Sequence, residues 1–120
     1  MKIAIPVDQQ SLESNVAANF GRAANFLFFD TESKAVEYLD NSAVMSQGGA
    51  GIKAAQSVAD HGVKVLITPR CGQNAVDVLN GANIEMFQAI EGNAQANLDA
   101  FAEGKLESLS NIHAGFHHQG

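Results

Sequence analysis

The sequence predicts a mixed α/β fold: a five-stranded sheet with helices on both faces. Residues 63–67 form a short apolar run rich in β-branched side chains, which is typical of a buried strand. A polar loop at residues 70–74 and a stretch of helical spacing follow that run. Similar strand-like and helix-like stretches alternate along the chain in the order β-β-β-α-β-α-β-α.

Length and composition favour one compact domain. The chain has 120 residues, of which 46% are hydrophobic and 17% are charged. A net charge of −6 argues against nucleic acid as a partner, because that binding requires clustered basic residues. No apolar run reaches the roughly 20 residues of a membrane span, and the N-terminus lacks a signal-peptide pattern. With a single cysteine, we expect a cytoplasmic protein without membrane contact.

The first half of the chain predicts three strands. Residues 2–7 (KIAIPV) are the first, with Pro6 expected to end or bulge the regular ladder. A long polar connection follows over residues 8–22, a length that is commonly functional. Residues 25–30 and 34–39 then predict a hairpin, with its turn at residues 31–33.

The second half predicts helices alternating with strands. After a loop over residues 40–51, a helix is expected from Ile52 to the stop at His61 and Gly62. The run at 63–67, the loop at 70–74 and a helix come next, then a strand at 84–88 and a helix at 93–102. We assign residues 1–106 to one cofactor-binding domain and residues 107–120 to a C-terminal tail that contains histidines.

The connections predict the sheet topology. Hairpin strands must be antiparallel, and β-α-β units must be parallel with right-handed crossovers. Numbered along the sequence, the five strands therefore take the order 3-2-1-4-5, with strand 2 antiparallel to the others. The loops at 8–22, 40–51 and 70–74 then meet at one edge, where such sheets usually bind ligands.

Several segments, in order, resemble one protein family. They are KIAIPVD, NFGRAANFLFFD, GGAGIKAAQSVADHGVKVLI, GQNAVDVL and AIEGNAQANLDAFAEGKL. This set resembles the dinitrogenase iron–molybdenum cofactor biosynthesis family, a nitrogenase accessory family that includes NifX-type carriers and the C-terminal domain of NifB. The resemblance implies a ribonuclease H-like, three-layer α/β/α fold. It also implies a non-catalytic protein that binds an anionic metal–sulfur cluster and carries it to or from a client or donor protein, here unidentified. Resemblance to small members of the family, the orange proteins, implies that the bound cluster is a molybdenum–copper sulfide. The alternative cargo is an iron–molybdenum cofactor precursor.

Candidate anion-binding residues lie in the three converging loops and, for Lys53, in the first turn of the helix expected from Ile52. Glycines before a helix can cradle an anion on free N–H groups, although a flexible loop would look the same. Arginine adds a rigid, permanently charged fork of donors, unless it is simply a solvated residue. The candidates are Arg22, Gly48, Gly49, Gly51, Lys53, Arg70, Gly72 and Asn74.

Three further residues are candidate metal ligands. Cys71 precedes a predicted helix, where the pKa of a thiol is lowered and copper(I) could be bound, but it could equally be a small core residue. His113 and His117 would share one face if that segment were helical, and would otherwise belong to a polar tail.

Two rival functions stay open. The same crevice could bind a phosphorylated small molecule in an enzyme or regulator, or the domain could bind another protein without any cofactor. Nuclease activity is not expected, because the acidic residues do not converge as Mg²⁺ chemistry requires.

Overall fold

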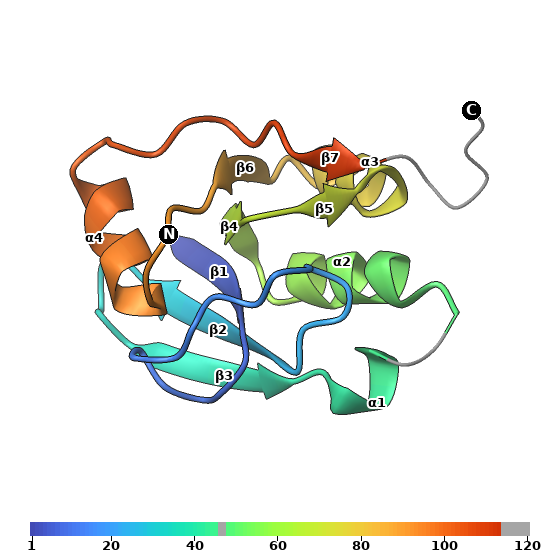
Figure 1. Ribbon diagram of the computed structural model, residues 1–120, viewed down its shortest axis with the longest axis horizontal. Helices are drawn as coiled ribbons and strands as arrows, with labels where there is room; N and C mark the ends of the chain where they lie inside the picture. The colour runs from blue at the N-terminus through green and yellow to red at the C-terminus, as the bar shows by residue number, and fades with distance from the viewer. Residues whose placement is uncertain (46–47, 114–120) are drawn as a thin grey trace.

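The computed structural model describes residues 1–45 and 48–113. Within them the chain forms a mixed α/β fold (Figure 1) whose elements, in chain order, are β1 (Lys2–Val7), β2 (Asn25–Asp30), β3 (Val36–Asp40), α1 (Ser42–Met45), α2 (Ala50–Asp60), β4 (Val63–Thr68), β5 (Cys71–Gly72), α3 (Gln73–Gly81), β6 (Glu85–Gln88), α4 (Ala94–Ala102) and β7 (Ile112–His113).

The main sheet confirms the predicted topology. Its order is β3-β2-β1-β4-β6, in which β6 is the fifth strand predicted from the sequence. β2 pairs antiparallel with both β1 and β3, whereas β1–β4 and β4–β6 are parallel pairs. The carboxyl ends of β1 and β4 therefore meet at one edge, as the sequence predicted.

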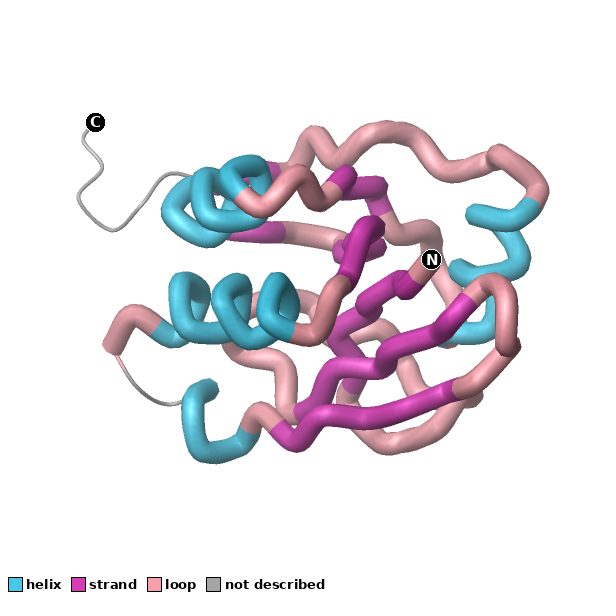
Figure 2. Tube along the Cα trace, turned by 180° about the vertical axis from the view of Figure 1, so that it is seen from behind, coloured by secondary structure: helices cyan, strands magenta, loops and turns pink. Residues whose placement is uncertain are grey.

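Alternate side chains of the strands build two cores, one on each face of the sheet. Ala4, Phe26 and Leu66 face α2 and α3 on one side. Ile5 and Ile67 belong to the other core, which α4 covers. Figures 1 and 2 show α2 and α3 together on one side of the sheet and α4 on the opposite side, which gives three layers.

Pro6 is accommodated because β1 pairs with its two neighbours, β2 and β4, over different lengths. Pairing with β4 includes only Lys2, Ile3 and Ala4. Pairing with β2 continues through Pro6, which lies opposite Phe26. The regular parallel ladder thus ends before the proline, as expected, and the Pro6 carbonyl accepts a hydrogen bond from Ala17 N at 2.8 Å.

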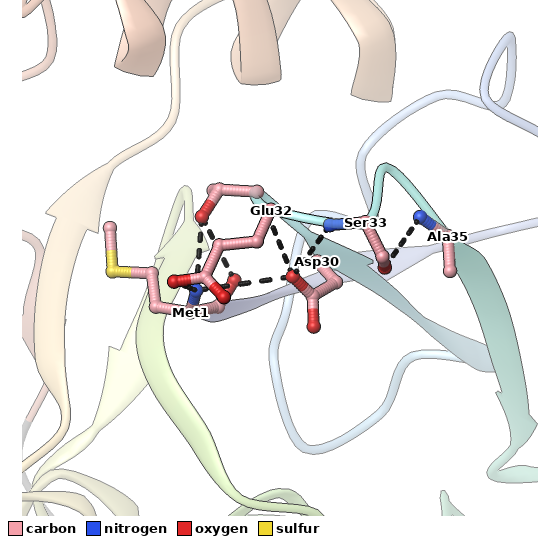
Figure 3. Close-up of polar contacts among 6 residues, drawn as sticks. Met1, Asp30, Glu32, Ser33 and Ala35 are labelled. Atoms are coloured by element: carbon pink, nitrogen blue, oxygen red, sulfur yellow. Dashed lines mark hydrogen bonds and ion pairs between the residues drawn. The ribbon is translucent and has the colours of Figure 1, made fainter.

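The turn between β2 and β3 lies at the opposite edge of the sheet from the converging loops, because β2 runs antiparallel to β1 and ends beside Lys2. Figure 3 shows the polar contacts of this turn. The Asp30 carboxylate accepts hydrogen bonds from the backbone N–H groups of Glu32 and Ser33, at 2.8 and 3.2 Å. These bonds lower the pKa of Asp30 below its ordinary value. The N-terminal amine of Met1 donates to Thr31 Oγ1 at 3.0 Å, which ties the chain start to this turn.

Three short elements were not predicted. The expected loop at 40–51 contains α1, and β5 and β7 pair as a separate two-stranded sheet. The segment from 107 to 113 returns along β6, where Gln88 N donates to Glu107 O at 2.7 Å and Leu109 N donates to Met86 O at 3.1 Å. No helix in the described ranges, 1–45 and 48–113, is long and apolar enough to cross a membrane.

Candidate functional site

A cavity lies where the loops after β1, β3 and β4 meet. Its volume is about 260 Å³. It is bounded by the loop before β2, the first turn of α2, the first turn of α3 and the end of β7. The lining residues are Phe20, Gly21, Arg22, Gly49, Gly51, Ile52, Gly72, Gln73, Asn74, Ala75 and His113.

The loop after β1 reaches this cavity through contacts that fix its path. Phe20 is buried and stacks at a tilt on Phe26 of β2, with ring centroids 5.1 Å apart. The Arg70 carbonyl, just after β4, accepts hydrogen bonds from Phe20 N at 3.4 Å and from Thr68 Oγ1 at 3.1 Å. The loops after β1 and β4 are thus joined directly.

A buried asparagine holds the next part of the same loop. The side chain of Asn41 is 2% exposed, and its Nδ2 donates to the carbonyl of Ala23 at 2.8 Å and to that of Gly21 at 3.5 Å. Sequence reasoning missed Asn41, because an asparagine after a strand looks like an ordinary turn residue. Its burial on satisfied hydrogen bonds makes it a positioning residue for the cavity wall.

The first turn of α2 lies against this loop. Gly49 is the N-cap residue with φ of 72°, a left-handed conformation that suits glycine. No side chain caps this helix end. The free N–H groups of the first turn, including those of Gly51 and Ile52, are therefore available at the cavity.

The first turn of α3 has the same character. Its N-cap residue is Gly72, again without a side-chain cap. By contrast, α4 begins away from the cavity and is capped by Asn93 Oδ1, which accepts from Ala96 N at 2.8 Å. The two helices that begin at the cavity thus present uncapped N-termini, each equivalent to about half a positive charge.

The predicted anion-binding residues divide into two groups. Arg22, Gly49, Gly51, Gly72 and Asn74 line the cavity. Gly48, Lys53 and Arg70 are exposed and do not line it. Arg70 still contacts the wall, because its Nε donates to Nδ1 of His113 at 3.0 Å. Among the lining residues that sequence reasoning missed, Gly21 carries a recognisable signal, since it belongs to the NFGR segment.

Cys71 lies in the core. Its side chain is 0% exposed and packs in the cluster that contains Ala4 and Leu66. Burial raises the pKa of the Cys71 thiol to about 12, despite a hydrogen bond from Gly72 N–H that acts in the opposite direction. The expected lowering of this pKa was wrong, because desolvation outweighs the hydrogen bond from the Gly72 N–H group.

His113 is in strand β7 and not in a helix. Burial, and after it the positive charge of Arg70, lowers the pKa of His113 below its ordinary value, which favours the neutral imidazole. His117, its predicted metal-binding partner, lies outside the described residues. Within the described part of the chain, no three His, Cys, Asp or Glu side chains lie close enough to hold a metal ion.

A second, larger hollow has a different chemistry. It has a volume of about 530 Å³ and lies between α3, β6 and the returning segment at 108–112. Of the described residues that line it, only Glu85 is charged. That carboxylate disfavours an anion, so the smaller cavity with Arg22 and two helix N-termini is the candidate site.

Comparisons with known proteins agree with this architecture. Residues 1–104 match the sequence model of the family described as dinitrogenase iron–molybdenum cofactor. No curated protein gives a significant match to the chain.

Solved structures give the same result. The apo form of the orange protein from Desulfovibrio gigas is 34% identical, with a TM-score of 0.86 over 92% of this chain and 93% of that one. A Thermotoga structure described as a NifB protein is 36% identical, with a TM-score of 0.82 over 99% of this chain and 98% of that one. A Methanocaldococcus jannaschii structure described as a dinitrogenase is 20% identical, with a TM-score of 0.70 over 92% of this chain and 96% of that one, and supports the fold alone.

Proposed function

Since the chain belongs to the dinitrogenase iron–molybdenum cofactor family, we propose that it binds an anionic metal–sulfur cluster at this cavity and carries it without catalysis. The cargo that we propose first is a molybdenum–copper sulfide cluster, by similarity to orange proteins. An iron–molybdenum cofactor precursor is the alternative cargo. The cluster would pass to or from a client protein, in a cytoplasm that keeps the free Cys71 reduced.

One observation carries this proposal: two uncapped helix N-termini and Arg22 border the same cavity. Each helix end offers backbone N–H groups and a partial positive charge. Local donors are required, because a net charge of −6 repels an anion at long range. A unit-charge pair about 4 Å apart is worth roughly 1 kcal/mol in water and roughly 4 kcal/mol near a protein surface.

The chemistry of the lining fits a cluster that brings its own sulfide ligands. Four glycines line the cavity: Gly21, Gly49, Gly51 and Gly72. The N–H group of Gly21 already donates to Asn19 Oδ1 at 3.1 Å, so the available donors are the N–H groups in the uncapped first turns of α2 and α3. The cavity offers no thiolate, since the Cys71 thiol is buried and its pKa is about 12. Binding through N–H donors to anionic sulfide, with no bond from protein to metal, is the mode that this donor set favours.

The test is reconstitution of the purified protein with tetrathiomolybdate and copper(I), followed by gel filtration, metal analysis and an absorption spectrum. We expect molybdenum and copper to co-elute with the protein, and a visible band to appear. Arg22→Gln should weaken binding at least tenfold. Lys34→Gln is the matched control, because Lys34 lies in the turn at the opposite edge of the sheet. Equal loss in both variants would place the site elsewhere.

The same donor set also suits phosphate, which keeps a phosphorylated small molecule as the second candidate ligand. Competition separates the two. Displacement of bound tetrathiomolybdate by phosphate or a sugar phosphate at millimolar concentration would support the phosphate function and contradict the carrier function. Binding of phosphate by a protein that does not bind tetrathiomolybdate would lead to the same conclusion.

A further inference from the structure

The returning C-terminal segment is attached to the end of β4, beside the cavity, by the side chain of Gln88. Its Oε1 accepts hydrogen bonds from the backbone N–H groups of Ser110 and Asn111, both at 3.3 Å. Its Nε2 donates to the carbonyl of Pro69 at 2.7 Å. One half-buried amide thus joins the exit of β4 to the chain just before β7.

Strand pairing then brings His113 to the start of α3. Cys71 N donates to Asn111 O at 3.2 Å, and β5 and β7 pair in parallel so that Gly72 lies opposite His113. The imidazole covers Gly72 closely: a Cβ at that position would be 3.2 Å from His113 Nε2, its nearest neighbour. Nε2 therefore lies beside the uncapped first turn of α3, and His113 lines the cavity.

The contact with Arg70 determines which ring nitrogen carries the proton. A guanidinium group can only donate, so Nδ1 of His113 must accept the 3.0 Å hydrogen bond from Arg70 Nε. In a neutral imidazole the proton is then on Nε2. Metal coordination through Nε2 would need that proton to leave or to move to Nδ1, which would break the bond with Arg70.

Resting on the function proposed above, we propose that strand β7 is a wall of the cluster site and that the Nε2–H of His113 donates a hydrogen bond to the bound anion. Arg70 is a positioning residue, because it holds the imidazole in the donating tautomer. The ligand class is an anion with sulfide or oxo acceptors, and the role of His113 is that of a donor and not of a metal ligand.

The test uses the full chain, with tetrathiomolybdate alone as the probe. His113→Phe keeps a planar ring but removes the donor, and should weaken binding at least tenfold. His113→Gln keeps an N–H donor at nearly the same reach, and should stay within threefold of the unchanged protein. His113→Phe preserves the shape of the ring and His113→Gln does not, so a purely structural role would weaken binding at least as much in His113→Gln as in His113→Phe.

A spectroscopic readout on the unchanged protein does not depend on the folding of any variant. Nitrogen-15 shifts of the His113 ring should show a protonated Nε2 and an unprotonated Nδ1, before and after the probe is added. The Hε2 resonance should move on binding. Arg70→Lys keeps the charge but loses the Nε donor, and should give a mixture of both tautomers.

Three results would overturn the inference. The first is a His113→Phe variant whose affinity for tetrathiomolybdate is within twofold of that of the unchanged protein. The others are an equal loss of affinity in His113→Phe and His113→Gln, and loss of the Nε2 proton when the probe binds. The first result leaves the proposed function intact while removing His113 from it. Failure of the unchanged protein to bind the probe at all would instead contradict the proposed function, and this inference with it.

Discussion

Gly21 lies directly against Gly51: a Cβ added to Gly21 would be 2.7 Å from the Cα of Gly51 and 2.9 Å from its backbone nitrogen. Because both neighbours are backbone atoms, no side chain can rotate away to make room. The wall formed by the loop before β2 and the start of α2 therefore depends on the absence of a side chain at position 21.

Gly21→Ala should separate these two segments, lowering the free energy of unfolding by about 1–3 kcal/mol and weakening binding of tetrathiomolybdate. Urea unfolding and a binding titration are the measurements. Gly81→Ala is the control, because a Cβ there meets nothing within 4 Å and Gly81 ends helix α3. The control should be neutral or slightly stabilising. If both variants have the same stability and the same affinity, the close contact between Gly21 and Gly51 is not required for folding or for binding.

A single charge at the start of α2 should decide whether an anion binds. A Cβ on Gly49 meets nothing within 4 Å, and Asn and Asp tolerate the left-handed conformation better than other side chains. Gly49→Asn and Gly49→Asp differ by one negative charge at nearly the same shape. We expect the Asp variant to bind tetrathiomolybdate at least tenfold more weakly than the Asn variant, measured by isothermal titration. Similar affinities would show that the anion is not near α2.

Cys71 should be unreactive in the folded protein. With a pKa of about 12, its thiol remains protonated at pH 8, and the buried sulfur is inaccessible. A disulfide reagent such as DTNB should label it only after unfolding in guanidinium chloride. Cys71→Ala should retain tetrathiomolybdate binding, although the cavity left in the core costs stability. Rapid labelling of the folded protein, or loss of tetrathiomolybdate binding by a folded Cys71→Ala variant, would support Cys71 as a metal ligand.

Asn97 should contribute to stability but not to binding. Its buried amide accepts from Ile90 N at 2.8 Å and donates to the carbonyls of Ile90 and Asn93, at 3.2 and 3.0 Å. Asn97→Ala removes these bonds from the N–H and carbonyl groups of Ile90, whereas the Asn93 carbonyl still accepts from the backbone N–H of residue 97. The variant should lower the free energy of unfolding by about 2–3 kcal/mol. The exposed Gln95→Ala should change it by less than about 0.5 kcal/mol. Denaturant curves test both, and weaker binding by folded Asn97→Ala would link α4 to the site.

The main sheet could be predicted because its signals are local and consistent. The inner strands β1, β2 and β4 are short, largely apolar runs, and the hairpin and crossover rules then leave few possible orders. Pro6 illustrates this reasoning: its missing N–H excludes a continued parallel ladder, and that ladder does end at Ala4.

The wall formed by β5 and β7 could not be predicted in the same way. Ile112 and His113 show no periodic pattern in the sequence. Their positions are determined by backbone pairing with β5 and by hydrogen bonds of the Gln88 side chain. The partners of Gln88 are more than 18 residues away from it along the chain. Such long-range polar contacts leave no periodic signal in one sequence.

Cys71 and Asn41 show a second limit. Each is a residue type that suits its local position, as a thiol before a helix and as a turn asparagine. What decides their chemistry is burial, which depends on the packing of distant elements. Local motifs therefore predicted which loops border the cavity but could not assign the state of these side chains.

The central claim is that an anion binds between the uncapped N-termini of α2 and α3. The most direct test is a two-dimensional NMR titration of the nitrogen-15-labelled protein with tetrathiomolybdate. We predict the largest amide shifts at Gly49, Gly51, Ile52 and from Gly72 to Ala75, with little change at Ala96, where Asn93 already caps α4. Shifts centred on the α4 cap or on the hollow beside β6, with the first turns of α2 and α3 unmoved, would contradict the account.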